Sequence, residues 1–448
     1  MTRVQAGYLT SSSQRHVAPA ALSQPTTVWW LNPAVLFTAV VIGTLLPAVA
    51  LSDSSYSTYG TPKYLDLRSL GLAILACGMV AGGVMLGSYV GAAPRRISSA
   101  TRHSLVPWFY LASGLTVIGY VVWIASAIRN GLRPGHVAEL LAGVDHEAFL
   151  TLKTEIFTTV PGISTCTQFG LLAVMLAGVL LQRDTRFWKP LVATILGLAA
   201  ARAVIYSERL ALLEVAVVLG VVLLRTRVLN RRLGPAGHMA LLVAPVVGIG
   251  LLLALMAGTE YFRSWQYYQN DFDSLLSFTA NRLAGYYSTS HNNGAMAWNM
   301  TDGWPVPYYT LEWFWKFPLV RPTPLGYEQL VGFDPELTHA AMLEQWGNPE
   351  FNNPGGLFGP TIDFGVIGGA LFWLAFGLVA GRLYRGFVTG SLAGLLLYPI
   401  LVLTMFELPR YLYLCTVRPF PAIALIFFIL WRVSAQSTSS AREVAHAN

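Results

Sequence analysis

The chain has 448 residues, of which 54% are hydrophobic and only 11% are charged, whereas an average soluble domain is about a quarter charged. This composition excludes an ordinary soluble protein and predicts an all-α polytopic membrane protein. The net charge of +7 is not gathered into a basic patch, so nucleic acid is not expected as a partner.

Ten apolar runs are long enough to cross a hydrocarbon core of about 30 Å, which takes roughly 20 helical residues. They lie at residues 29–51, 71–93, 105–127, 156–181, 188–205, 209–224, 239–258, 362–381, 389–408 and 419–431. We therefore expect transmembrane helices 1–7 within 29–258 and transmembrane helices 8–10 within 362–432. Between them, residues 259–361 form one large loop, and polar tails occupy residues 1–28 and 433–448.

Charge orients these spans, because short cytoplasmic connections retain Lys and Arg. Ten spans put both termini on one side, and the polar segments there carry sixteen Lys and Arg against only Asp184 and Glu443. The loop over 259–361 instead carries four basic and ten acidic residues. We expect the two tails in the cytoplasm and the loop on the extracytoplasmic side.

Within the second run, Gly83, Gly87 and Gly91 repeat at four-residue spacing. Such a row of small residues allows another helix to approach closely. The pattern predicts a tight helix–helix contact.

Two arginines flank the very short connection between the fifth and sixth runs, Arg202 and Arg209. Charge at the edge of the hydrocarbon core is costly unless it is paired or faces a watery cavity. One interpretation is pairing with Glu208 or Glu214, and another is snorkelling to lipid headgroups. The third is a functional site.

Two more arginines, Arg410 and Arg418, lie in the connection between the ninth and tenth runs, on the same expected outer side. Positive charge there opposes the positive-inside pattern. Four such exceptions from two separate connections indicate an external, anionic partner.

The large loop is predicted to contain short amphipathic helices. Helical periodicity follows Glu260, and a turn rich in hydrogen-bonding groups is expected at Ser290–Gly294. A second helix should begin after Asp334, a good N-cap, with Pro335 as its first residue, and end near Trp346.

Aromatic and amide side chains of this loop are suited to sugars, because ring faces stack on the apolar face of a pyranose and amides bind hydroxyls. The alternative is that the aromatic residues pack on lipid. The candidate sugar-binding residues are Tyr286, Tyr287, Asn292, Asn293, Asn352 and Asn353.

Three sequence motifs resemble a known family. They are Ser207-Glu208-Arg209 at the start of a span, Arg-Leu-Ala-Gly-Tyr-Tyr at 282–287 with Asn-Asn-Gly at 292–294, and Asn-Asn-Pro-Gly-Gly-Leu-Phe-Gly-Pro-x-x-x-Phe-Gly at 352–365. Together with the architecture of residues 70 to 430, they resemble the oligosaccharide repeat-unit polymerases, or Wzy-type O-antigen polymerases, which are related to the O-antigen ligases.

The resemblance implies a membrane glycosyltransferase of the GT-C type that acts on polyprenyl-pyrophosphate-linked glycan at the outer face of the plasma membrane. It implies no metal, no cofactor and no nucleotide sugar. The implied partners are the lipid-linked glycan, membrane lipid, a flippase and a chain-length regulator. An O-antigen-type ligase remains an alternative, as does a transporter or flippase of lipid-linked sugar.

For such a transfer, fixed guanidinium groups can stabilise the negative charge that develops on the pyrophosphate leaving group. We assign Arg209, Arg282, Arg410 and Arg418 to this role, with Arg202 and Arg263 in reserve. The acceptor hydroxyl needs a base or correct orientation. The candidate bases are His291, then Glu260 and Asp363.

Overall fold

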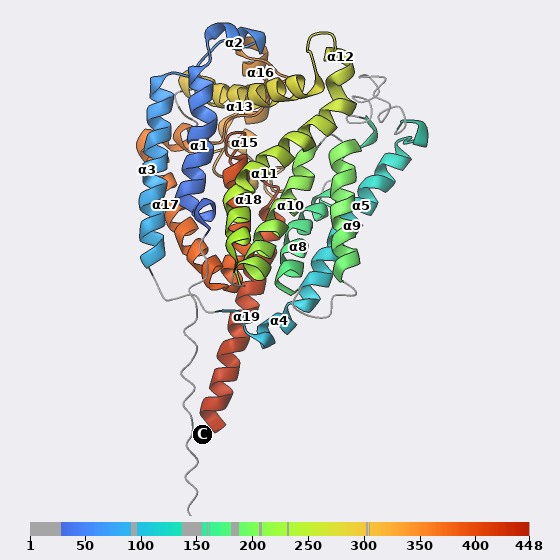
Figure 1. The fold of residues 1–448 in the computed structure, drawn as a ribbon, viewed down its shortest axis with the longest axis vertical. Helices are drawn as coiled ribbons and strands as arrows, with labels where there is room; N and C mark the ends of the chain where they lie inside the picture. The colour runs from blue at the N-terminus through green and yellow to red at the C-terminus, as the bar shows by residue number, and fades with distance from the viewer. Residues whose placement is uncertain are drawn as a thin grey trace, which may run out of the picture.

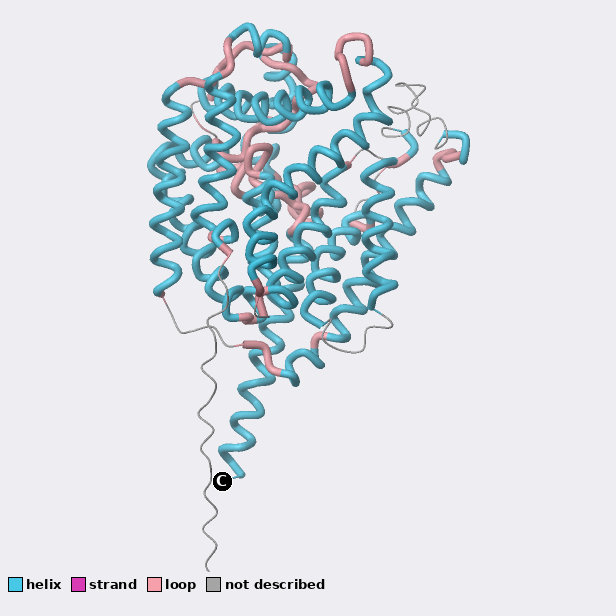
Figure 2. The backbone as a smooth tube through the Cα atoms, in the orientation of Figure 1, coloured by secondary structure: helices cyan, strands magenta, loops and turns pink. Residues whose placement is uncertain are grey.

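The computed structural model describes residues 28–90, 96–136, 155–158, 160, 162–180, 188–205, 208–230, 233–301, 303 and 305–447, without the side chains of 262, 263, 266 and 436–447. Within these residues the protein is all-helical and forms no β-strand, as Figure 2 shows. The helices stand side by side as a bundle (Figure 1).

In the part of the chain that the structure describes, six helices are long and apolar enough to cross a membrane. They are α1 (Pro33–Ala50), α3 (Leu67–Tyr89), α4 with α5 (Ser99–Ser104 and Val106–Arg129), α9 (Trp188–Ile205), α11 (Pro235–Glu260) and α17 (Gly359–Thr389). The protein is therefore a helical membrane protein, as the composition predicted.

The other four predicted spans fall on helices that do not meet these criteria. They are α8 (Phe169–Leu180, after the 3-10 turn η3, Ser164–Gln168), α10 (Arg209–Leu223, followed by the π-helix η4, Leu224–Val228), α18 (Leu392–Glu407) and α19 (Phe420–Ala447). Ten spans thus stay a prediction.

Most of the segment between α11 and α17 gathers at one end of the bundle, which we call the α13 end (Figure 1). The helix α13 (Leu275–Met300) lies across this end. The shorter elements of the segment are η5 (Tyr261–Trp265), α12 (Gln266–Tyr268), α14 (Glu312–Trp315), α15 (Tyr327–Val331) and α16 (Pro335–Trp346). Other short elements that the structure describes are η1 (Trp29–Leu31), α2 (Asp53–Thr58) and η6 (Tyr413–Cys415).

The two sequence predictions for this segment have opposite outcomes. The helix after Asp334 is confirmed, because the Asp334 carboxylate accepts a hydrogen bond from the Glu336 amide and Pro335 opens α16. The turn at Ser290–Gly294 is wrong, because these residues lie inside α13.

Tertiary contacts explain why this polar stretch stays helical. The Asn292 carboxamide oxygen accepts from the Tyr64 amide at 2.7 Å, and the Asn293 carboxamide donates to the Asn353 carbonyl at 3.1 Å. Side-chain amides that could otherwise hydrogen-bond to the local backbone and stabilise a turn are therefore bonded to other segments of the chain. A Cβ on Gly294 would overlap the Phe358 ring, so the helix needs glycine there for close packing.

The close contact predicted for the second span is the one between α3 and α17. A Cβ added to Gly83 or Gly87 would overlap backbone atoms of α17, and one added to Gly377 or Gly381 would overlap backbone atoms of α3. Glycines of both helices therefore let the two backbones touch. Gly91 lies outside the described residues.

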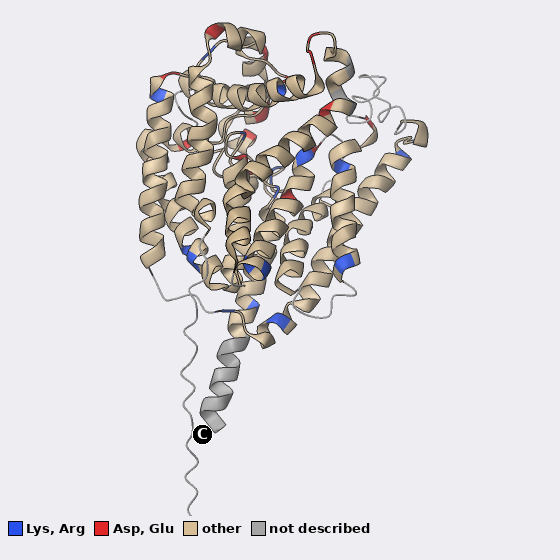
Figure 3. Ribbon diagram, viewed as in Figure 1, with Lys and Arg blue, Asp and Glu red and all other residues tan. Residues whose placement is uncertain are grey.

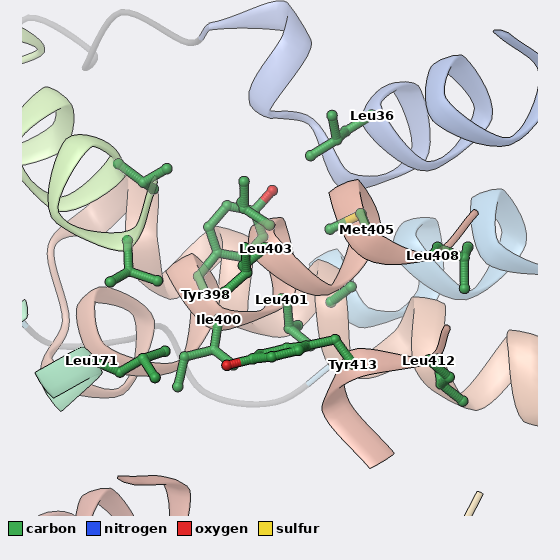
Figure 4. Packing of buried hydrophobic residues seen from close by; sticks show 14 of the residues in the cluster. Leu36, Leu171, Tyr398, Ile400, Leu401, Leu403, Met405, Leu408, Leu412 and Tyr413 are labelled. Carbon is green, nitrogen blue, oxygen red and sulfur yellow. The ribbon is translucent and has the colours of Figure 1, made fainter. Parts of the chain in front are cut away.

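The helix α18 forms the centre of the bundle. Figure 4 shows its side chains from Tyr398 to Met405 packed among residues of other elements, including Leu36 of α1 and Leu171 of α8. The Tyr398 hydroxyl donates to the Leu31 carbonyl. Burial of most of its side chains fixes α18. The polar residues that follow Glu407 are thereby held at the α13 end.

Candidate functional site

A cavity of about 550 Å³ lies at the α13 end, within the range of roughly 300–1,000 Å³ typical of ligand sites. We call it the arginine cavity. Its polar lining consists of Glu208, Arg209, Glu260, Arg282, Tyr286, Tyr287, Glu350, Asn352, Glu407, Arg410, Tyr411 and Arg418, and its apolar lining of Leu210, Leu213, Leu252, Met256 and Leu283. One cavity therefore offers both charged groups and a hydrocarbon wall.

Four arginines from distant parts of the chain meet in this cavity. They are the four assigned above to the pyrophosphate leaving group. Arg209 opens α10, Arg282 lies in α13, and Arg410 and Arg418 lie in the connection between α18 and α19. The charged residues within the upper half of the bundle are visible in Figure 3.

The two reserve arginines are placed differently. Arg202, in α9, does not line the cavity, but its Nε donates to the Glu208 carboxylate at 2.7 Å and its guanidinium lies 5.3 Å from the Trp123 ring centre. Arg202 therefore supports the cavity wall from behind. The side chain of Arg263 lies outside the described residues.

Each arginine of the cavity is ion-paired with a glutamate. The pairs are Arg209 with Glu260, Arg282 with Glu350, Arg410 with Glu407, and Arg418 with both Glu208 and Glu214. The carboxylates hold the guanidinium groups in fixed positions, and they balance the positive charge of the cavity.

These ion pairs differ in how far the glutamate side chain is exposed to solvent. The Glu350 side chain is 40% exposed, whereas that of Glu260 is 1% exposed and that of Glu407 is 6% exposed. An incoming anion can therefore replace Glu350 beside Arg282 at the lowest cost, because Glu350 alone moves readily into solvent.

The described residues leave one N–H donor of Arg410 without an acceptor. Its Nη1 donates to Glu407 at 2.7 Å, while its buried Nε has no hydrogen-bond partner among the described residues. Its guanidinium lies 5.2 Å from the Tyr286 ring centre and 5.3 Å from that of Tyr411. A buried donor without an acceptor favours an anionic or oxygen-rich ligand at this point.

Glu208 stays ionised between two guanidinium groups. Burial alone would raise the pKa of this carboxyl, but Arg418 and Arg202 outweigh burial and hold it below its ordinary value. The charge of Glu208 in turn keeps Arg418 in place.

Of the three candidate bases, only Glu260 lines the cavity. Its carboxylate pairs with Arg209 and lies 4.0 Å from the Arg282 Nε. It is 1% exposed and ends α11, so it is held at the junction of two arginine-bearing helices.

His291 does not reach the cavity, so its expected place there is wrong. It is fully buried in α13, and its Nε2 lies 2.9 Å from the Thr44 hydroxyl of α1. Burial lowers the pKa of His291 to about 3. The ring thus joins α13 to α1 as a neutral group and is a poor proton acceptor near neutral pH.

Asp363 does not reach the cavity either. Its carboxylate accepts hydrogen bonds from the amides of Tyr308, Tyr309 and Thr310 and from the Thr310 hydroxyl. Four donors saturate the carboxylate, which anchors the loop before α14 to the start of α17.

The sugar candidates divide equally. Tyr286, Tyr287 and Asn352 line the cavity. The other three do not, because Asn292 and Asn293 tie α13 to neighbouring segments and the Asn353 carbonyl is an acceptor for Asn293. Polar residues of one motif thus have different positions. Some line the cavity, and others form hydrogen bonds between segments of the protein.

Sequence patterns assign no role to several residues that line the cavity. Glu350 and Glu407 were not assigned, although Glu407 lies three positions before Arg410, a spacing that suits an ion pair on a helix. The leucines of α10 and α11 carried no signal at all, because a lipid-facing leucine and a cavity leucine look the same in an apolar run.

No group of three or more His, Cys, Asp and Glu suited to a metal ion occurs within the described residues. One Asp-x-Asp pair, Asp271 and Asp273, lies between α12 and α13 and does not line the arginine cavity.

No family model, curated protein or solved structure matches this chain. What the molecule does must therefore be inferred from the cavity itself.

Proposed function

We propose that the protein is a membrane glycosyltransferase that extends or transfers polyprenyl-pyrophosphate-linked oligosaccharide. One observation carries the proposal, which is that four arginines from distant segments line one cavity together with an apolar wall. The charged part suits a pyrophosphate, and the leucine-lined part suits the first isoprene units of its lipid. The motifs that resemble the O-antigen polymerases lie on the same elements.

In the proposed reaction, the glycosidic C–O bond to the pyrophosphate breaks and the acceptor hydroxyl forms a new C–O bond to the same sugar carbon. The leaving pyrophosphate keeps the electron pair, and Arg209, Arg282 and Arg410 stabilise its charge. Arg282 contributes most directly, because exchange of Glu350 for a phosphate oxygen frees its guanidinium fork.

The remaining parts of the cavity position the sugars. Tyr286, Tyr287 and Tyr411 offer ring faces, and Asn352 offers an amide. Glu260 takes the role of proton acceptor for the attacking hydroxyl, since it alone of the candidate bases lines the cavity. Arg418 is bonded through Nε, Nη1 and Nη2 to Glu208 and Glu214, so it acts as a fixed wall of the site.

The proposal also includes the topology. The α13 end faces the extracytoplasmic side of the plasma (inner) membrane, and ten spans cross it. Support comes from the charge distribution, because the segment that gathers at this end is acidic while the connections at the opposite end are rich in arginine.

The test uses purified protein and the lipid-linked repeat unit extracted from cells that lack the protein. The two are incubated with EDTA, and the products are separated on a gel. A ladder of longer lipid-linked chains supports a polymerase, and a single product on a new lipid acceptor supports a ligase. Movement of intact substrate across vesicles without a new glycosidic bond would show a transporter and contradict the proposal.

Paired variants connect the activity to the cavity. Arg282→Gln removes a lining guanidinium, whereas Arg382→Gln removes one in α17 that donates to the Val90 carbonyl and does not line the arginine cavity. We expect loss of product only in the first. Equal activity of the two variants would separate the reaction from this cavity.

A further inference from the structure

A second, smaller cavity of about 90 Å³ lies at the end of the bundle opposite α13. It is bounded by residues 96–102, by η4 after α10, and by the turn between α17 and α18. Its polar lining is Arg96, Arg102, Arg225, Thr226, Asn230 and Thr389. A single water needs only roughly 10–15 Å³ of such space, so the cavity has room for a larger group.

Arg225 is the buried centre of this cavity. It is 3% exposed, and its Nε donates to the Phe387 carbonyl at 2.8 Å, its Nη2 to the Val388 carbonyl at 2.6 Å, and its Nη1 to the Asn230 amide oxygen at 2.5 Å. The two carbonyls end α17, where the helix dipole supplies only about half a negative charge. A full positive charge is thus held by neutral groups.

Arg96 is held beside it. Its Nε donates to the Thr389 carbonyl at 3.2 Å, and the neighbouring Ile97 amide donates to the Gly390 carbonyl at 3.3 Å. Gly390 has φ of +79°, and a Cβ there would lie 3.3 Å from the Arg225 Nη2. Glycine therefore permits both the turn and the close approach of the guanidinium.

The charge of this cavity differs from that of the arginine cavity. No Asp or Glu is among its described lining residues, and the described hydrogen bonds of Arg96 and Arg225 go to carbonyl and amide oxygens. Every arginine of the other cavity instead has a glutamate partner. Partly buried positive charges so close together repel, and an anion that bridges them removes this cost. Guanidinium groups bind phosphate oxygens with particularly good geometry.

The position of the cavity indicates which kind of anion would bind there. The cavity lies at the ends of α10, α17 and α18, where these helices would meet the lipid headgroups, and basic pockets between membrane helices are known binding places for anionic headgroups. We propose that this cavity binds the phosphate of an anionic phospholipid. The inference stands independently of the proposed glycosyl transfer.

Bound lipid would act on the rest of the fold through two helices. Both α10 and α18 run from this cavity to the arginine cavity, where Arg209 begins one and Glu407 ends the other. A phosphate that bridges η4 and the α17–α18 turn holds these helices together and raises the stability of the whole bundle.

The test measures the melting temperature of the full-length protein in neutral detergent with phosphatidylglycerol, phosphatidylcholine or inorganic phosphate, at equal ionic strength. We expect phosphatidylglycerol to raise the melting temperature by several degrees, and native mass spectrometry to show one retained lipid. An equal rise with inorganic phosphate alone would identify the soluble anion as the ligand and contradict the lipid assignment. An equal rise with phosphatidylcholine would show an effect of the acyl chains and overturn the proposal.

The test variant is the double substitution Arg96→Gln with Arg102→Gln, which leaves the buried Arg225 in place. Its control is Arg382→Gln with Arg385→Gln, which removes two charges from α17 near the same end without touching the cavity lining. The proposal requires the first variant to lose most of the lipid-dependent rise and the second to keep it. Should both keep it, the cavity does not bind the lipid.

Discussion

At the scale of single residues, Arg282 combines a solvent-exposed partner with a position inside the arginine cavity. Arg282→Lys keeps the charge but loses the planar fork that binds two phosphate oxygens. We expect turnover of the lipid-linked glycan to fall about 10- to 100-fold, the equivalent of one charged hydrogen bond of roughly 1.5–3 kcal/mol. A gel-based rate measurement checks this.

The matched control is Arg129→Lys, because Arg129 is an exposed residue at the end of α5 and lies outside the cavity. Its rate should equal that of the unmodified protein. If Arg282→Lys also kept the full rate, the guanidinium of Arg282 would have no part in binding the leaving group.

His291 gives a second prediction, this time on stability. The unfolded chain binds a proton at this histidine below about pH 6.5, but burial lowers the pKa of the folded-state ring to about 3. Between these values the unfolded state binds more protons, so this group makes the free energy of unfolding fall as the pH falls. His291→Gln should remove that contribution and flatten the acid side of the stability curve.

Melting temperatures at about pH 7.5 and about pH 5, on either side of the unfolded-state value, provide the measurement. The difference between the two temperatures should be smaller in His291→Gln, and glycosyl transfer should persist because His291 does not line the cavity. Complete loss of transfer in a stably folded variant would return His291 to the role of base.

The contrast between the arginines and His291 shows what sequence can predict of this site. Arginines at the outer ends of spans stood out because their positions oppose a strong physical bias. His291 and Asp363 have suitable chemistry, yet Thr44 bonds one ring nitrogen of His291 and Thr310 bonds the Asp363 carboxylate inside the protein. The hydrogen-bond partner of such a polar side chain lies far away in sequence. A local pattern therefore cannot distinguish a catalytic group from a residue that only links two segments of the protein.

At the scale of elements, sequence patterns predict a helix correctly where the interactions that define its start lie within one turn. The cap and proline of α16 act within a single turn, and that helix begins where they predict. The stretch Ser290–Gly294 has a turn composition but forms helix, since contacts to residues 61–65 and 351–353 outweigh its local preference.

The glycine contact between α3 and α17 gives the prediction at this scale. A Cβ on Gly87 would overlap the Leu378 backbone, whereas one on Gly78 of the same helix meets no atom within 4 Å. Gly87→Ala should lower the free energy of unfolding by about 1–3 kcal/mol through overpacking. Gly78→Ala should be neutral or slightly stabilising, because alanine favours helix over glycine.

Melting curves of the two variants in the same detergent provide the comparison. The pair is informative because both substitutions add one methyl group to one helix. Equal stability of the two variants would mean that α3 and α17 do not touch at Gly87.

At the scale of the whole molecule, the two ends differ in how charge is compensated. Acidic residues gather in the upper half of the bundle, and basic residues lie at the lower end (Figure 3). Glutamates fix the arginines of the arginine cavity, while carbonyl groups fix Arg225 at the opposite end. Arginine is thus paired with carboxylates in the arginine cavity, whereas Arg225 bonds to carbonyl groups at the opposite end of the bundle.

This polarity leads to the last prediction, which concerns orientation. If short cytoplasmic connections retain arginine, then the start of α11 faces the cytoplasm and the segment around α15 faces outside. Leu325 is 61% exposed in that segment, and Ala236 is exposed in the first turn of α11. Single cysteines are placed at these positions after replacement of Cys77, Cys166 and Cys415. A membrane-impermeant maleimide should label Leu325→Cys in intact cells, and Ala236→Cys only after permeabilisation. The reverse pattern would place the arginine cavity in the cytoplasm, where it could not act on a glycan at the outer face.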